Sequence, residues 1–126
     1  MQVRHYEQVA SQPVDMPGAS GCRVRWLIGT ADGAPNFAMR QFEVAVGGHT
    51  PRHSHPYEHE VFVLDGRGVV SGGDVERPVA AGDVIFMPAD EVHQFRNAGD
   101  QPFRFLCLVP NTAAQPAVPA PECGRE

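Results

Sequence analysis

Three of the six histidines in this chain lie in one short run, HSHPYEH at residues 53–59. Imidazole nitrogens are good ligands for divalent transition metals. Side chains two residues apart in a strand share a face, so His53 and His55 would direct two rings at one point. Pro56 interrupts strand pairing, which would let the chain turn and return His59 to the same point. Because imidazoles buried together without partners are costly, the run predicts an interior metal site; a surface cluster is the alternative.

His93 is the fourth candidate ligand. The segment from Gly82 to Asn97 consists of a turn, an apolar strand, a corner at Pro88 and a second strand that starts near His93. Such a corner would bring His93 back to the interior. The sequence therefore predicts a metal site made of four histidines.

The elements that must position these histidines are short strands. Segments rich in Val, Phe, Ile and Leu recur between turns rich in Gly, Asp, Asn and Pro, and no long stretch has a helical apolar period. The predicted strands span residues 22–28, 36–46, 59–64, 68–70, 84–87, 92–96 and 103–109. Many short, regularly spaced strands indicate an all-β sandwich, jelly roll or barrel.

The chain has 126 residues, a length that suits one hydrophobic core. We expect an N-terminal arm at residues 1–20, a barrel at 21–110 and a tail at 111–126. The tail is rich in Pro and Ala and poor in large apolar residues, so it is predicted to be flexible.

The composition excludes several classes of function. The formal net charge is -5 and Lys and Arg do not cluster, which argues against a nucleic-acid partner. No uninterrupted apolar run resembles a signal peptide or a membrane span, so we expect a soluble cytoplasmic protein without a membrane partner. The three cysteines form no C-x-x-C pair, which argues against a disulfide framework or a cysteine zinc site, and Cys107 is interpreted as core.

Together, the two histidine segments resemble the paired motifs of the cupins, G-x5-H-x-H-x3/4-E-x6-G and G-x5-P-x-G-x2-H-x3-N. The matching residues are Gly47, His53, His55 and Gly66 in the first motif and Gly82, Pro88, His93 and Asn97 in the second. The resemblance covers about residues 22–109. It implies a double-stranded β-helix, which is a jelly-roll barrel, with a metal inside and often a homodimer. Asp90 stands where the second motif has Gly, and Asp is one of the few other residues that adopts left-handed backbone angles.

The third ligand is a choice between His59 and Glu60, since the family position is usually Glu. Six residues separate His59 from Gly66, as the motif requires, whereas five separate Glu60 from it. Strand alternation places His59 on the inner face and Glu60 on the outer face, unless a bulge exchanges the faces. We predict His59, as in small cupins with an all-histidine site that contain H-x-H-P-x-E-H-E. Four neutral imidazoles would leave the full charge of a divalent ion, which favours an anionic, chelating guest.

Two further residues are candidates for substrate binding. Arg40 shares a face with the apolar even positions of residues 36–46, from which it could bind a substrate carboxylate; a solvated or interface arginine is the alternative. Phe95 shares a face with His93 and could line the pocket, although plain core packing is the alternative. For the metal, the family and the ligand set favour Mn(II) or Fe(II), followed by Ni(II) and Zn(II).

Three functions remain open at this point. The first is a metal-dependent enzyme acting on a small organic anion: a dioxygenase, a lyase or an isomerase. The second is a non-catalytic module that binds or senses an oxalate-like dicarboxylate through its metal. The third is a structural barrel with vestigial histidines. A cupin fold by itself does not decide among them.

The choice of third ligand is directly testable. The substitution His59→Ala should reduce the metal content of the purified protein far more than Glu60→Ala, because only the first removes an inward-facing donor. Elemental analysis of both variants would measure this, and a larger loss in Glu60→Ala would reverse the assignment.

Overall fold

The computed structural model describes residues 1–111 of the chain, which form an almost entirely β structure. Two short 3-10 helices, η1 and η2, accompany nine strands. In chain order the elements are η1 (Tyr6–Gln8), β1 (Gln12–Pro13), β2 (Ser20–Ile28), η2 (Thr30–Asp32), β3 (Phe37–His49), β4 (His59–Asp65), β5 (Arg67–Gly72), β6 (Val75–Ala80), β7 (Val84–Met87), β8 (His93–Asn97) and β9 (Phe103–Pro110).

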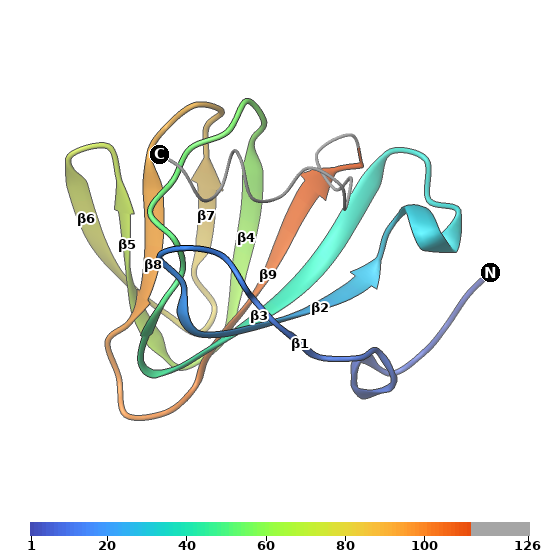
Figure 1. The fold of residues 1–126 in the computed structure, drawn as a ribbon, viewed down its shortest axis with the longest axis horizontal. Coiled ribbons are helices and arrows are strands. Elements are labelled where there is room, and N and C mark those ends of the chain that lie inside the picture. Colours follow the sequence, from blue (N-terminus) through green and yellow to red (C-terminus); the bar gives the residue numbers. More distant parts are fainter. Residues whose placement is uncertain (112–126) are drawn as a thin grey trace.

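The strands form one antiparallel sheet that curls into a half-barrel (Figure 1). Along the sheet the order is β6-β5-β8-β3-β9-β4-β7, and β2 extends it from β3. Neighbours in space are mostly distant in sequence, as in a jelly roll, and the predicted all-β double-stranded β-helix is confirmed. Among the described strands, β6 and β7 at the two ends of this path do not pair with each other.

The core follows from side-chain alternation along the strands. In β4 the buried residues are His59, Val61 and Val63, and in β9 every second residue from Phe103 to Val109 is buried. The inner face of β3 contains Ala38 and Val44, as the even-position pattern predicted, whereas Val46 is exposed and Gln41, at an odd position, is buried. Aromatic rings fill the interior in a row: Phe105 stacks on Phe42 at 5.4 Å and on Phe95 at 4.7 Å between ring centroids.

Backbone geometry at two turns explains the residues found there. Asp90 has φ 68°, and it is the non-glycine residue with positive φ in the described part of the chain. It therefore takes the left-handed conformation for which the second motif normally uses Gly. Gly66 has φ 82°, and a Cβ there would lie 2.5 Å from the Pro102 carbonyl oxygen, so a side chain would not fit.

Two features of the fold differ from the sequence-based expectation. Strand β6 was not predicted, because Pro78 lies within it and its residues are largely exposed. The proline is tolerated because β6 is an edge strand that pairs with β5 alone. His53 and His55 lie in a loop, not in the predicted strand, and a single bridge links His53 to β8.

The N-terminal arm is attached to the half-barrel by β1 and by Arg25 of β2. Strand β1 pairs with β2 from Gln12 to Pro13. Arg25 donates to the carbonyl oxygens of Tyr6 and Val9, at 3.2 and 2.6 Å, so the arm is held along its length. Residues 112–126 of the expected tail lie outside the described residues, and Asn111, where that tail was predicted to start, is buried.

The outer face of the β9-β4-β7 region carries several exposed apolar side chains. Phe62, Val84, Phe86 and Leu108 are all exposed there. The homodimer that the family resemblance implies stays a prediction. In the described part of the chain, no helix has the length and apolar character needed to cross a membrane.

The core assignment predicts a contrast between two phenylalanines. Phe103→Ala should lower the free energy of unfolding by about 3–5 kcal/mol, because it empties a fully buried position. Phe86→Ala, at a position that is 62% exposed, should change it by less than about 1 kcal/mol. Urea denaturation would measure both, and equal losses would contradict this description of the core.

Candidate metal centre

The loop between β3 and β4 is fastened to β8, and this places the first two histidines. The backbone N–H of His93 donates to the His53 carbonyl at 2.8 Å, and that of His53 donates to the His93 carbonyl at 3.1 Å. Three residues before His53, the Thr50 N–H donates to the Phe95 carbonyl at 2.9 Å. The Asp90 N–H donates to the His55 carbonyl at 2.8 Å, so both ends of the histidine pair are held.

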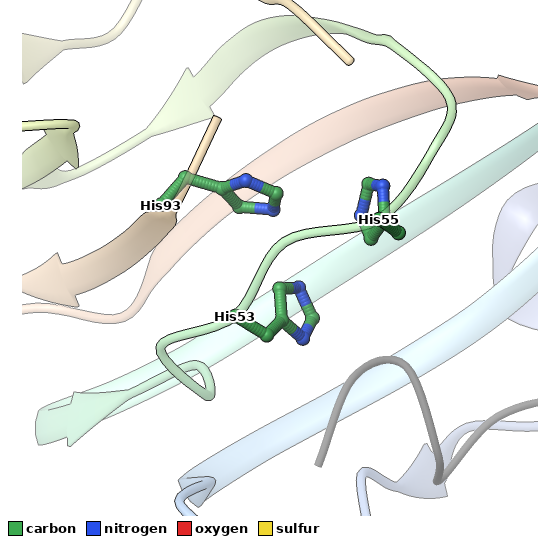
Figure 2. Close-up of side chains that lie close together, drawn as sticks. All are labelled: His53, His55 and His93. Carbon is green, nitrogen blue, oxygen red and sulfur yellow. The ribbon is translucent and has the colours of Figure 1, made fainter. Parts of the chain in front are cut away.

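Three imidazoles converge where this loop meets β8 (Figure 2). The ligand atoms of His53, His55 and His93 all lie within 4.8 Å of one another, and all three side chains are shielded by the fold. Ring centroids are 4.8 Å apart for His53 and His93 and 4.9 Å apart for His55 and His93. These three residues could hold a metal ion.

His59 reaches the same cluster from β4. Its Nε2 lies 2.6 Å from Nε2 of His55, and the two rings stack in parallel with centroids 4.4 Å apart. The ring of His59 lies 5.0 Å from that of His93. Glu60 is exposed on the outer face, where a hydrogen bond with Glu58 raises its pKa. The predicted orientations of both residues are found, and the ligand role of His59 stays a prediction.

The ring orientations of two histidines suit metal binding. Nδ1 of His55 lies 3.0 Å from the Tyr57 carbonyl, and Nδ1 of His93 lies 2.8 Å from the Glu91 carbonyl. A carbonyl only accepts hydrogen bonds, so each Nδ1 carries the proton and Nε2 keeps its lone pair. Neutral imidazoles oriented in this way by a backbone carbonyl are the usual form of metal-bound histidine.

Burial keeps two of these histidines uncharged. Desolvation, followed by the nearby His93 and His53, lowers the pKa of His55 from 6.5 to about 3. Desolvation, with a smaller contribution from the positive charge of Arg40, lowers the pKa of His59 even further. Both rings are therefore neutral at pH 7, which is the protonation state that a metal requires.

The histidines open into a cavity of about 60 Å³ with mostly apolar walls. Both predicted substrate-binding residues line it. Phe95 is only 3% exposed and stacks on Phe105. The Arg40 guanidinium lies over the rings of Trp26 and Phe42, 5.3 and 5.0 Å from their centroids. Their roles toward a substrate stay predictions.

Several cavity residues were not predicted from the sequence, among them Val14, Met16 and Cys107. Val14 and Met16 belong to the N-terminal arm, whose sequence shows no periodicity that would have placed it over the barrel. Cys107 was interpreted as core, and it is indeed 1% exposed, but it also lines the cavity. Its inward position in β9 could have been read from strand alternation, whereas its neighbours depend on the sheet order.

The family assignment follows from a match to the Cupin_2 family, described as the cupin domain, over residues 40–109, which is more than half of the chain. The chain belongs to the cupin family. Among solved structures, this cupin is 38% identical to the polyketide cyclase RemF from Streptomyces resistomycificus, with a TM-score of 0.83 over 88% of this chain and 80% of that one. It is 29% identical to the cupin-2 domain Rru_A2000 from Rhodospirillum rubrum, with a TM-score of 0.73 over 87% of this chain and 74% of that one.

Two curated relatives are similar over much of the chain. The cupin is 37% identical to the 1-methylthio-D-xylulose 5-phosphate methylsulfurylase of Rhodospirillum rubrum over 64% of this chain. The match spans about half of that relative, 52% of its length. It is also 33% identical to Protein SchB of Streptomyces halstedii, over 78% of this chain and 68% of that protein.

The lowered histidine pKa values predict acid sensitivity of the metal-free cupin. In the unfolded chain His55 and His59 take up protons below about pH 6.5, whereas in the fold they stay neutral. The free energy of unfolding should therefore fall as the pH drops below 6.5, by about 1.4 kcal/mol per pH unit for each histidine. Urea denaturation between pH 6.5 and 5 would measure this slope.

The matched variants separate these histidines from other titrating groups. The double substitution His55→Gln, His59→Gln should flatten the slope, while His5→Gln, at an exposed side chain, should leave it unchanged. A slope that is the same in all three proteins would contradict neutral burial.

Proposed function

We propose that this cupin is a metal-dependent enzyme that acts on a small chelating organic anion, and that its chemistry begins at a carbon next to a carbonyl. The observation that carries the proposal is the convergence of four imidazoles, of which His55 and His59 are held neutral by burial, on a small apolar cavity that Arg40 also lines. Such a donor set suits a divalent transition metal. The preferred ions are Mn(II) or Fe(II), followed by Ni(II) and Zn(II).

In this proposal His53, His55 and His93 hold the ion and His59 is the fourth ligand. When bound, the ion supplies Lewis acidity, which makes the hydrogen next to a chelated carbonyl more acidic. The protein contributes neutral donors that leave the charge of the ion uncompensated. An anion that chelates through two oxygens is the guest that this charge favours.

Arg40 would bind the second negative group of that guest. Its guanidinium is fixed between two aromatic rings and faces the cavity beside the histidines. Arginine binds carboxylates and phosphates with paired hydrogen bonds, and the apolar walls around Phe95 and Phe105 strengthen such contacts by excluding water. With a cavity of about 60 Å³, the site accommodates a chelating head group and not a large ring system.

The relatives favour carbon-acid chemistry over oxygenation. A polyketide carries ketones separated by one carbon, and 1-methylthio-D-xylulose 5-phosphate is a ketose phosphate. Both compounds therefore have acidic hydrogens next to a carbonyl. A cyclisation, isomerisation or elimination that starts by removing such a hydrogen would be common to these substrates.

The reaction class can be tested without knowing the substrate. The cupin, loaded with each of the four metals, would be incubated in deuterated buffer with acetoacetate, acetylacetone and ketopentose phosphates, and deuterium uptake next to the carbonyl followed by NMR. We expect exchange that requires metal and disappears in His93→Ala. Oxygen consumption with a diketone would instead identify a dioxygenase, and oxalate binding without any conversion would identify a binding module. Absence of metal uptake would refute the proposal.

The role of Arg40 predicts a selective effect on binding. Arg40→Gln should weaken the binding of acetoacetate to the metal-loaded protein by about 10-fold or more, because a charged hydrogen-bonding partner of the carboxylate is lost. The binding of methyl acetoacetate, which keeps both carbonyls but lacks the charge, should stay the same. Calorimetric titration would measure both ligands, and equal weakening would remove Arg40 from the substrate site.

A further inference from the structure

The Cys107 thiol lies between two residues of the proposed site. Its Sγ is 3.1 Å from Nδ1 of His59 and 3.0 Å from Nη2 of Arg40. The sheet register produces this arrangement, because β9 runs between β3 and β4. In that register Cys107 pairs with Arg40 on one side and with Val61, two residues beyond His59, on the other.

The chemistry of a thiol suits this position. Arg40 has only donors, so Sγ accepts from the guanidinium, while toward His59 the thiol either donates or accepts. When the thiol donates to Nδ1, Nε2 of His59 carries the proton and hydrogen-bonds to His55 at 2.6 Å. When the thiol accepts from Nδ1, Nε2 of His59 is left with a lone pair for a metal. One residue thus supports the ring in both states.

A purely packing role does not explain these contacts. Cys22, the other buried cysteine among the described residues, makes hydrogen bonds with backbone carbonyls, including that of His49 at 2.9 Å. Cys107 makes its contacts with two functional side chains. Without Cys107, Nδ1 of His59 would lose its hydrogen-bond partner in an apolar interior. The guanidinium of Arg40 would lose its bond from Nη2, and its buried Nε already has no partner in the described structure.

We propose that Cys107 is a positioning residue whose thiol holds the His59 ring and the Arg40 guanidinium in a fixed relation to each other. The fourth imidazole and the anion-binding cation then face the same cavity at a set separation. The significance of that separation rests on the proposed function, whereas the positioning itself is a property of the protein alone.

The first test needs no metal. Long-range proton–nitrogen NMR of the metal-free protein reports which nitrogen of His59 carries the proton and whether the ring has one environment. We expect a single form in the wild type and in Cys107→Ser, whose hydroxyl also donates and accepts, and two or more forms in Cys107→Ala. The Arg40 Nε–H signal should broaden in Cys107→Ala for the same reason. The control is Cys22→Ala, which removes the other buried thiol of the described residues and should leave both signals unchanged.

The second test measures the consequence for a bound ion. Cys107→Ala should lower the affinity for the metal by about 10- to 100-fold, as is usual when the partner of a ligand histidine is lost. Cys107→Ser should retain most of the affinity and Cys22→Ala all of it. Pulsed EPR of bound Cu(II) should show an altered remote-nitrogen coupling in Cys107→Ala alone.

The outcomes separate the two proposals. A wild type that binds no metal but shows the Cys107-dependent NMR change refutes the proposed function and supports the positioning role. Normal metal uptake with an unchanged His59 signal in Cys107→Ala refutes the positioning role alone. Equal changes in Cys107→Ala and Cys22→Ala would also overturn it, since they would reflect a general loosening of the core.

Discussion

The antiparallel backbone bridge between His53 and His93 is the constraint on which the site depends. Its two hydrogen bonds, 2.8 and 3.1 Å long, join a loop that has no regular structure of its own to the first residue of β8. Without them the loop would have the freedom of any surface connection, and ordering it at the moment of ligand binding would cost conformational entropy. Because the bridge is formed in the fold, the two histidine motifs are held together in advance.

Burial then keeps His55 and His59 neutral, as ligands of a metal must be. The desolvation that lowers the pKa of His55 to about 3 acts against positive charge on the side chains of this cavity. Arg40 is the residue there whose guanidinium stays charged. That one cation is accommodated by two aromatic faces and a thiol, not by a carboxylate. Its charge is therefore not neutralised by a partner of opposite sign among these contacts and can act on a guest.

Much of the fold could be predicted from the sequence because its signals are local. Alternation along residues 59–64 distinguished the inward-facing His59 from the outward-facing Glu60, and the turn residues bounded most strands. Strand β6 was not predicted because its edge position, which tolerates Pro78, is a property of the sheet order. The contact of Cys107 with Arg40 was not predicted for the same reason, since Arg40 lies 67 residues away in the chain and the sequence does not show that β9 runs beside β3. Val14 and Met16 were not predicted to line the cavity, because the N-terminal arm that carries them has no periodic pattern.

The unpaired ends of the sheet have a consequence for the size of the interior. In a fully hydrogen-bonded barrel, strand number and shear together set the radius. Here β6 and β7 leave a seam, and the cleft beside it has a volume of about 500 Å³. Strand pairing alone therefore does not fix the curl of this sheet. Substitutions at a few inward positions are therefore expected to change the volume around the histidines without loss of strand pairing.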